Sequence, residues 1–330
     1  MISAELLHRF HPFKRRYRVL VVGDLMLDHY IWGDTRRISP EAPVPVVSVN
    51  KESLSAGGAG NVAVNLARLG VACEVCGFVG TDVPGRQLVE LLREEGIDHD
   101  ARFQRAGAAT IRKTRIVVRR QQICRVDHEG PAETYRIRVD EEGDFLRAAC
   151  DRADAVIVCD YAKGGLTSEL VEALTQRIHA RGGLIAVDPK PANAIAMRDM
   201  DVLTPNRPES YELAGLPAAE SGADYPAEEI CRRIHERFAP RHLVITLGED
   251  GILYAREGQV VLQVPTRARE LFDVSGAGDT VVAALVVGLL AGMDHAAAIA
   301  FANCAAGVVV GKLGTATASW KEIEEFLEKA

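Results

Sequence analysis

Residues 18–23, RVLVVG, form a short β-branched run that ends in glycine. Such a run is typical of a strand buried on both faces at the centre of a parallel sheet. Helix-like stretches follow at 60–69 and 85–95, and residues 73–80 between them are strand-like. The alternation of strand and helix predicts an α/β fold with a doubly wound, mostly parallel sheet and helices on both faces. Further strand-like runs lie at 155–160, 184–189, 201–206 and 242–248.

Two segments, 30–50 and 103–128, interrupt this alternation. Both are strand-like and rich in proline or arginine, with no helix between their strands. We expect them to form antiparallel strands of a small extra sheet beside the main one. Their cations concentrate positive charge, although charged side chains also protect a solvated sheet edge. These cations are Arg36, Arg37, Arg112, Lys113, Arg115, Arg119, Arg120 and Arg125.

Length and charge limit the classes of function. The chain has 330 residues, and 39 Lys and Arg against 46 Asp and Glu give a net charge of −7. A nucleic-acid surface is disfavoured because such interfaces need a basic field. A site for an anionic small molecule must therefore be locally basic. The length allows two domains, but no repeat or low-complexity linker divides the chain, so we expect a single domain over 1–330.

The N-terminal residues, the apolar stretches and the cysteines together predict a cytoplasmic protein that does not span a membrane. The first 18 residues carry charges throughout and lack the apolar core of a secretory signal. The longest apolar stretch, 281–293, is too short to span a bilayer. Seven cysteines are an odd number and suit reduced thiols. The Cys73/Cys76 pair lacks the further ligands of a zinc site, so we expect buried structural cysteines.

The sharpest chemical signal is DVSGAGDT at 273–280, which runs directly into an apolar helix. Small residues at a helix start leave backbone N–H groups uncovered, and the helix dipole adds positive potential, so the stretch predicts an anion cradle. Asp279 directly follows the glycines and can reach a hydroxyl held beside that cradle. This arrangement suits phosphoryl transfer. The alternative is an aspartate that caps a helix after a glycine turn.

Two other stretches resemble phosphate-binding motifs, but neither has the residues or the neighbouring elements that its motif requires. Residues 307–313, GVVVGKL, are one residue short of a P-loop and have leucine where the magnesium-binding Ser or Thr should stand. Residues 58–63, GAGNVA, imitate a dinucleotide fingerprint but follow a polar stretch instead of a buried strand. A dinucleotide-dependent oxidoreductase therefore has little support.

The GAGD stretch at 276–279 and AGGAGN at 56–61 together resemble the ribokinase, or PfkB-type, carbohydrate kinases. The resemblance covers nearly the whole chain and implies a ribokinase-like fold with a small β-sheet lid. Residues 21–47 are more specific, since they are similar to the bacterial D-glycero-β-D-manno-heptose-7-phosphate kinases of that family. The other matching positions are Gly23-Asp24, Asp188-Pro-Lys190, Asn206-Arg-Pro-Glu209 and Thr246-Leu-Gly248.

The resemblance implies roles for the phosphate-side residues. Asp279 stands at the position of the catalytic base, and Gly276, Ala277 and Gly278 supply the backbone anion hole. Asn206 and Glu209 match the motif that organises Mg²⁺ and the ATP phosphates through water, which fits the coordination that Mg²⁺ prefers. Glu209 could alternatively be only a first-turn helix carboxylate. We expect the adenine pocket near Thr246, Gly248 and Asn303.

Sugar recognition is expected from the N-terminal half of the chain. Asp24 and Asp28 lie just beyond a strand end, at the crevice where open α/β sheets bind ligands. Gly57 and Gly58 would let the backbone approach the sugar, and Asn61 can donate and accept. Each could instead be only a turn former or cap. For a sugar phosphate, our first candidates are Arg115 and Lys190, and the weaker ones are Arg36, Arg37, Lys113 and Arg125.

Together these features predict an ATP- and Mg²⁺-dependent kinase that phosphorylates O1 of D-glycero-D-manno-heptose 7-phosphate to the β-1,7-bisphosphate. The alternatives are a kinase of ribose, fructose 1-phosphate or adenosine, and a non-catalytic sugar or nucleotide sensor. The resemblance also implies a homodimer paired through the lid. Because the sequence ends soon after the kinase pattern, we expect a monofunctional chain.

Overall fold

The computed structural model describes residues 17–119, 121–218, 224–266, 275–312 and 314–329. An eight-stranded sheet forms its centre, in the order β14-β13-β12-β11-β10-β9-β1-β4. The strands from β4 to β12 pair in parallel, and β13 and β14 add an antiparallel edge. The mostly parallel sheet is thus confirmed. Its strands are β1 (Arg18–Gly23), β4 (Ala72–Cys76), β9 (Ala155–Cys159), β10 (Leu184–Asp188), β11 (Val202–Leu203), β12 (His242–Thr246), β13 (Ile252–Arg256) and β14 (Gln259–Val264).

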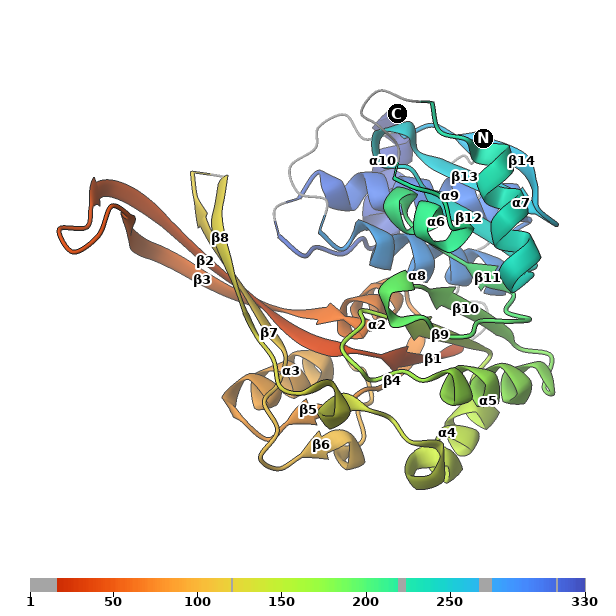
Figure 1. Ribbon diagram of the computed structural model, residues 1–330, viewed down its shortest axis with the longest axis horizontal. Coiled ribbons are helices and arrows are strands. Elements are labelled where there is room, and N and C mark those ends of the chain that lie inside the picture. The colour runs from red at the N-terminus through yellow and green to blue at the C-terminus, as the bar shows by residue number, and fades with distance from the viewer. Residues whose placement is uncertain (1–16, 120, 219–223, 267–274, 313, 330) are drawn as a thin grey trace.

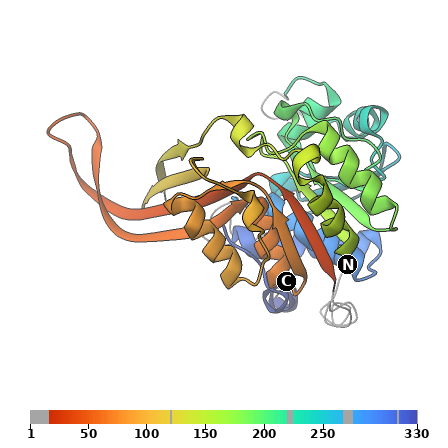
Figure 2. The same cartoon turned by 90° about the horizontal axis from the view of Figure 1, so that it is seen from below.

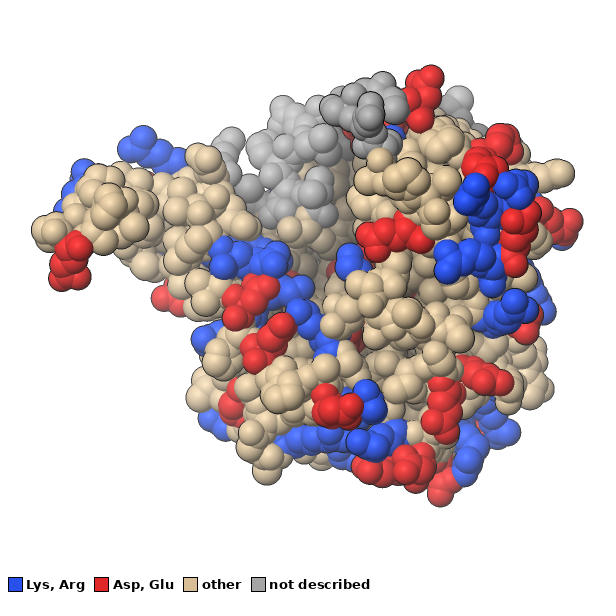
Figure 3. Space-filling model, in the orientation of Figure 1, with Lys and Arg blue, Asp and Glu red and all other residues tan. Residues whose placement is uncertain are grey.

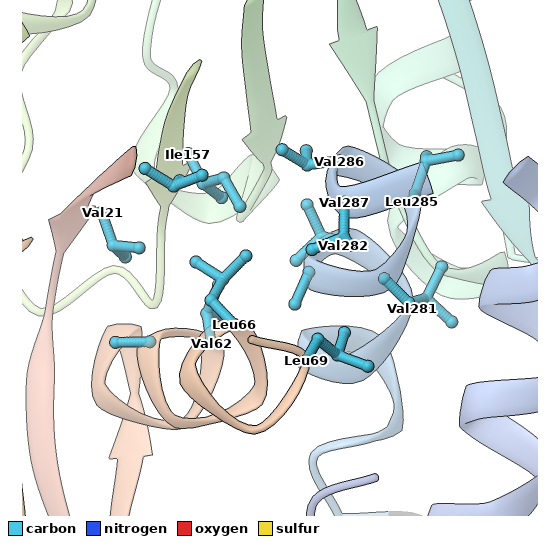
Figure 4. Packing of buried hydrophobic residues seen from close by; sticks show 14 of the residues in the cluster. Val21, Val62, Leu66, Leu69, Ile157, Val281, Val282, Leu285, Val286 and Val287 are labelled. Atoms are coloured by element: carbon cyan, nitrogen blue, oxygen red, sulfur yellow. The ribbon is translucent and has the colours of Figure 1, made fainter. Parts of the chain in front are cut away.

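Helices cover both faces of this sheet (Figure 1). Val19 and Val21 of β1 pack in one apolar cluster, and Leu20 and Val22 pack in the other, as the two-residue period of a strand requires. Figure 4 shows the first cluster, where Val21 and Ile157 of the sheet lie over α2 and α8. The first layer holds α2 (Ala59–Arg68), α3 (Val83–Glu94), α8 (Ala277–Leu290), α9 (His295–Val310) and α10 (Trp320–Lys329), and the second holds α4 (Val139–Arg152), α5 (Ser168–His179), α6 (Arg207–Ala214) and α7 (Ala227–Phe238).

A four-stranded sheet, here called the small sheet, projects from the body (Figures 1 and 2). Its order is β3-β2-β7-β8, and the long β2–β3 hairpin reaches farthest outward. β2 continues from β1 with only Asp24 between them. The strands are β2 (Leu25–Ile38), β3 (Pro45–Gly58), β7 (Arg112–Val118) and β8 (Gln121–His128).

The small sheet differs from the expected antiparallel arrangement at its centre. β2 and β7 pair in parallel, from Leu27 with Arg112 to Gly33 with Val118, while β2–β3 and β7–β8 are antiparallel. Parallel pairing requires a long crossover, and the chain between β3 and β7 supplies it with α2, β4 and α3. Residues 103–111 lie outside the small sheet, since Gln104–Arg105 (β6) pairs with Val79–Gly80 (β5). Arg120 lies outside the described residues.

Most expected elements match the structure within one or two residues, but the run at 201–206 contributes only the two residues of β11. Pro205 follows and has no N–H to donate to a strand ladder, and Asn206 already caps α6. Where the structure describes them, the stretches 307–313 and 58–63, which resemble phosphate-binding motifs in sequence, do not form phosphate-binding loops. Residues 307–310 lie inside α9, and Gly58 ends a strand of the small sheet before α2.

The cysteines, all of which are described, are free thiols, and only Cys124 is exposed. Burial raises the pKa of Cys150 to about 11 and that of Cys73 further. A thiol with a raised pKa carries little of the reactive thiolate, which agrees with a structural role for the Cys73/Cys76 pair. Among the described residues, no helix is both long and apolar enough to cross a bilayer.

Candidate active site

The candidate site lies at the carboxyl ends of three neighbouring parallel strands. Asp24 follows β1, Asp160 follows β9, and Asp188 ends β10. The strands approach so closely that a Cβ on Gly23 would lie 2.2 Å from the carbonyl oxygen of Cys159. This edge of an open parallel sheet is where ligands bind, and the start of α8 reaches it through Asp279.

Asp279 lies in the first turn of α8 and is only 8% exposed. Its Oδ2 accepts a hydrogen bond of 2.6 Å from the side-chain amide of Asn61. Its Oδ1 accepts one from the hydroxyl of Tyr161. Burial raises the pKa of Asp279, while the two donors act in the opposite direction. A buried carboxylate held by two donors is a suitable proton acceptor.

The backbone around Asp279 forms an open helix start. Gly276 caps α8 with φ 80°, and a Cβ there would lie 2.6 Å from the Asn61 amide nitrogen, so glycine is required. A Cβ on Gly278 would meet nothing within 4 Å. The first N–H groups of a helix lack partners within that helix, and such groups can bind an anion. Asp273 and Val274 of the motif lie outside the described residues.

The residues expected to bind sugar meet in two pairs. A Cβ on Gly57 would lie 2.4 Å from Asp28 Oδ2, and a Cβ on Gly58 would lie 2.4 Å from the carbonyl oxygen of Asp24. Asp28 is 4% exposed and accepts hydrogen bonds from Arg115 at 2.5 Å and Thr315 at 3.1 Å. The structure therefore brings Arg115 to the same place as Asp28.

The carboxylate of Asp24, which we expected to bind sugar hydroxyls, instead binds the backbone of a neighbouring loop. It accepts the backbone N–H groups of Tyr161 at 3.1 Å, Lys163 at 3.0 Å and Gly165 at 2.9 Å. A carboxylate has about four acceptor positions. Most of the acceptor capacity of Asp24 is thus occupied by the loop that follows β9.

The cations that the sequence analysis grouped together separate in the structure. Lys113 lies with its ammonium 5.8 Å from the ring centre of Tyr161, and burial lowers the pKa of Lys113. Lys190 instead pairs with Glu209 at 3.0 Å. Arg125 binds the neighbouring Asp127, and Arg36 and Arg37 lie on the outer part of β2. Figure 3 shows Lys and Arg side chains gathered where the small sheet meets the body.

Asn206 and Glu209 form a reciprocal capping box at the start of α6. The Glu209 N–H donates to Asn206 Oδ1 at 2.9 Å, and the Asn206 N–H donates to Glu209 Oε2 at 3.0 Å. Glu209 is therefore a carboxylate in the first turn of α6, as the structural alternative expected. The remaining lone pairs, together with the nearby Asp188 carboxyl, offer oxygen donors of the kind that Mg²⁺ prefers. In the described part of the chain, no three Asp, Glu, His or Cys side chains are grouped to hold an ion.

A cavity of about 440 Å³ lies beside the start of α8. Thr246 and Gly248 line one wall, and small or apolar residues of α8 and α9 line another. Asn303 lines it as well, but its side-chain amide donates to the carbonyl oxygen of Pro265 at 2.8 Å. The cavity also contains Asn206 and Gly278, so it connects the capping box with the helix start. A flat base and its phosphates fit this combination.

Three residues of the site were missed in the sequence analysis: Tyr161, Thr315 and Asp188 as a site carboxyl. Burial, and then the charges of Asp279 and Glu209, raise the pKa of Asp188, which is half-buried. Tyr161 and Asp188 both stand at the carboxyl end of a strand that the sequence did predict. The rule that placed Asp24 at this edge could therefore have indicated them.

A buried acid at a helix start thus lies beside a cavity whose size and lining fit a nucleotide, on a ribokinase-like fold. The model of the pfkB family of carbohydrate kinases matches residues 17–322. The chain belongs to this family and is a carbohydrate kinase. Kinase membership implies ATP as the phosphoryl donor.

Curated relatives agree with this assignment. The bifunctional protein HldE of Magnetococcus marinus is 42% identical over 326 residues, 98% of this chain and 66% of that protein. HldE of Geobacter sulfurreducens is 44% identical over 313 residues, 92% of this chain and 61% of that protein. The chain therefore spans less than two thirds of the length of either relative.

The solved structures show the fold. Ribokinase of Arabidopsis thaliana, complexed with ribose and ATP, has a TM-score of 0.71 at 20% identity and covers 95% of this chain and 99% of its own. Phosphofructokinase-2 of Escherichia coli, in complex with substrates and products, has a TM-score of 0.73 at 18% identity, with coverages of 96% and 99%.

Proposed function

We propose that this kinase transfers the γ-phosphoryl group of ATP to O1 of D-glycero-D-manno-heptose 7-phosphate, in the cytoplasm, to give the β-1,7-bisphosphate and ADP. The observation that carries the proposal is the position of Asp279. The nucleotide cavity lies on one side of it, and the half-buried cations Lys113 and Arg115 of β7 lie on the other. The similarity of residues 21–47 to heptose-7-phosphate kinases and the identity with HldE proteins support the choice of sugar.

Asp279 acts as the base in this proposal. As the acceptor oxygen forms its bond to the γ-phosphorus, its proton passes to the Asp279 carboxylate, and the bond from phosphorus to the bridging oxygen of ADP breaks. Burial raises the pKa of Asp279, which makes it a stronger base than an exposed aspartate. The N–H groups at the start of α8 stabilise the charge that develops on the phosphoryl oxygens.

Asn206, Glu209 and Asp188 would hold Mg²⁺ through water. When bound, Mg²⁺ neutralises charge on the ATP phosphates. Lys190, which pairs with Glu209, is better placed for those phosphates than for the sugar. We therefore assign the sugar phosphate to Arg115 and Lys113, and Asp28 to the hydroxyl groups of the sugar.

The product tests this function most simply. After incubation with ATP, Mg²⁺ and the heptose 7-phosphate, ³¹P NMR should show one new anomeric phosphate for each ADP released. Phosphate on another hydroxyl, or no ADP above the rate of ATP hydrolysis, contradicts the proposal. Asp279→Asn is the control, because it removes the base.

We further propose that two copies pair through the small sheet. All eight residues of the outer strand β8 are exposed. The small sheet and its hairpin turn also carry apolar side chains at least 42% exposed, and an unpaired edge of this kind favours strand pairing. These side chains are Ile38, Val44, Val49, Ile123 and Val126.

Sedimentation velocity tests the dimer. Wild type should sediment as a dimer, and Val126→Lys should sediment mainly as a monomer because a buried lysine opposes the pairing. Val261→Lys on β14, where valine is 55% exposed, is the matched control and should remain dimeric. A monomeric wild type contradicts the proposal.

A further inference from the structure

The hydroxyl of Tyr161 contacts the proposed base directly. It donates to Oδ1 of Asp279, while the Asn61 amide donates to Oδ2. Donors on both oxygens hold the plane of the carboxylate in one orientation. Each oxygen has a second lone pair, so an acceptor hydroxyl can still approach it.

The loop that carries Tyr161 is anchored by Asp24. The three backbone hydrogen bonds to Asp24 come from residues 161, 163 and 165 of this loop. Gly165 packs so closely that a Cβ there would lie 2.6 Å from Asp24 Oδ1. Asp24 is 2% exposed, which leaves its carboxylate little access to a ligand. The anchor therefore sets where the phenol of Tyr161 stands relative to the ends of the strands.

We propose that Tyr161 is a positioning residue for Asp279, and that Asp24 influences the reaction through Tyr161 instead of through a sugar hydroxyl. The inference rests on the proposed function, since it takes Asp279 as the base. A base already held in the orientation of attack needs no ordering when the acceptor arrives. Supporting hydrogen bonds of this kind keep catalytic groups within the narrow geometry that the reaction requires.

Burial raises the pKa of Asp279, and the charge of Asp28 acts in the same direction, while the Tyr161 hydroxyl, the Asn61 amide and Lys113 oppose it. A donor to a carboxylate favours the charged form. Tyr161→Phe therefore raises the pKa of Asp279 further. The titratable groups that face Asp279 are Asp28 of β2, Lys113 of β7, Cys159 of β9, Asp188 of β10 and Tyr161 itself.

The kinetic consequence has a definite sign. Only deprotonated Asp279 can accept the proton, so activity falls as the pH drops through its pKa. In Tyr161→Phe this acid limb moves to higher pH. All other groups around Asp279 are unchanged in that variant, so the difference from wild type reports the phenol alone.

The test uses two measurements on wild type and Tyr161→Phe. The first is the titration of Asp279 in ligand-free protein by ¹³C NMR of carboxyl-labelled aspartate, with Asp279→Asn identifying the signal. The second is the pH dependence of kcat from ADP release. Tyr254→Phe is the matched control, because it removes a buried phenol that contacts His242 at 2.8 Å and is not part of the site.

We expect Tyr161→Phe to shift both titrations to higher pH and to lower kcat roughly tenfold on the acid limb, with an unchanged KM for ATP. Tyr254→Phe should match wild type. Identical titrations in Tyr161→Phe and wild type would overturn the inference. The NMR titration needs no substrate. If it shifts but wild type does not phosphorylate the heptose 7-phosphate, the coupling of Tyr161 to Asp279 is supported and the proposed function is contradicted.

Discussion

The two sides of Asp279 are built from different parts of the fold. The nucleotide side is lined by α6, α8 and α9, whose packing belongs to the core of the body. The acceptor side takes Lys113 and Arg115 from the small sheet, which projects from that body. In the proposed site, the packing of the core therefore fixes the shape of the nucleotide-binding side, whereas the acceptor-binding side depends on the position of a separate sheet. Substitutions should therefore affect the two substrates separately, except at Asp279.

The largest effect is expected at Asp279, which serves both sides. Asp279→Asn keeps the size of the side chain but removes the proton acceptor. We expect kcat to fall by roughly 10²–10⁴-fold, with little change in the KM for ATP. ADP release measures kcat, and circular dichroism checks the fold. Activity within a few fold of wild type would exclude Asp279 as the base.

The next largest effect is expected at Arg115, and it should be confined to the acceptor side. Arg115→Ala removes the guanidinium that binds Asp28 and, in our proposal, the sugar phosphate. We expect the KM for the phosphosugar to rise by about 10- to 100-fold, while the KM for ATP is unchanged. Loss of the partner of a buried Asp28 should also cost about 3–5 kcal/mol of stability.

Two further variants control this prediction. Arg115→Lys keeps the charge but loses the fork that binds phosphate through two nitrogens, so it remains informative if Arg115→Ala unfolds. Arg125→Ala removes an exposed cation of β8 that binds only its neighbour Asp127 among the ion pairs described. An unchanged phosphosugar KM in both Arg115 variants would show that this arginine does not bind the sugar phosphate.

A smaller effect is expected at the helix start. Gly276 and Gly96 both have positive φ, 80° and 71°, but of the two only a Cβ on Gly276 would meet other side chains, most closely that of Asn61 and then that of Thr315. Gly276→Ala should therefore lose about 1–3 kcal/mol more stability than Gly96→Ala and should also lower kcat. Thermal unfolding compares the two variants. Equal losses would show that the Asn61 contact carries no constraint.

The main sheet and its carboxyl edge could be predicted because both follow from local patterns. Apolar runs such as 18–23 predict buried strands, and parallel strands bring their carboxyl ends to one edge. The capping box of Asn206 and Glu209 is equally local, since it spans four residues. The sequence predicted only a first-turn helix carboxylate at Glu209 as the alternative to a role in binding, and one side chain can serve both purposes.

Contacts between residues that lie far apart in the sequence could not be predicted. Lys190 follows Asp188 by two residues, yet it extends to Glu209 of α6 instead of toward Arg115. The parallel pairing of β2 with β7 depends on the whole crossover between them. Tyr161 reaches Asp279, 118 positions along the chain, from a loop that Asp24 anchors. These contacts depend on how separate elements pack, and no local pattern encodes that.

The most direct test of the account compares acceptors in one assay. ADP release is measured with phosphorylated and unphosphorylated heptoses, hexoses and pentoses, in wild type and in Arg115→Ala. The account predicts that wild type has its highest kcat/KM with D-glycero-D-manno-heptose 7-phosphate, and that Arg115→Ala loses the preference for the phosphorylated heptose. A higher kcat/KM with ribose, fructose 1-phosphate or adenosine would contradict it, as would an unphosphorylated heptose that is used equally well.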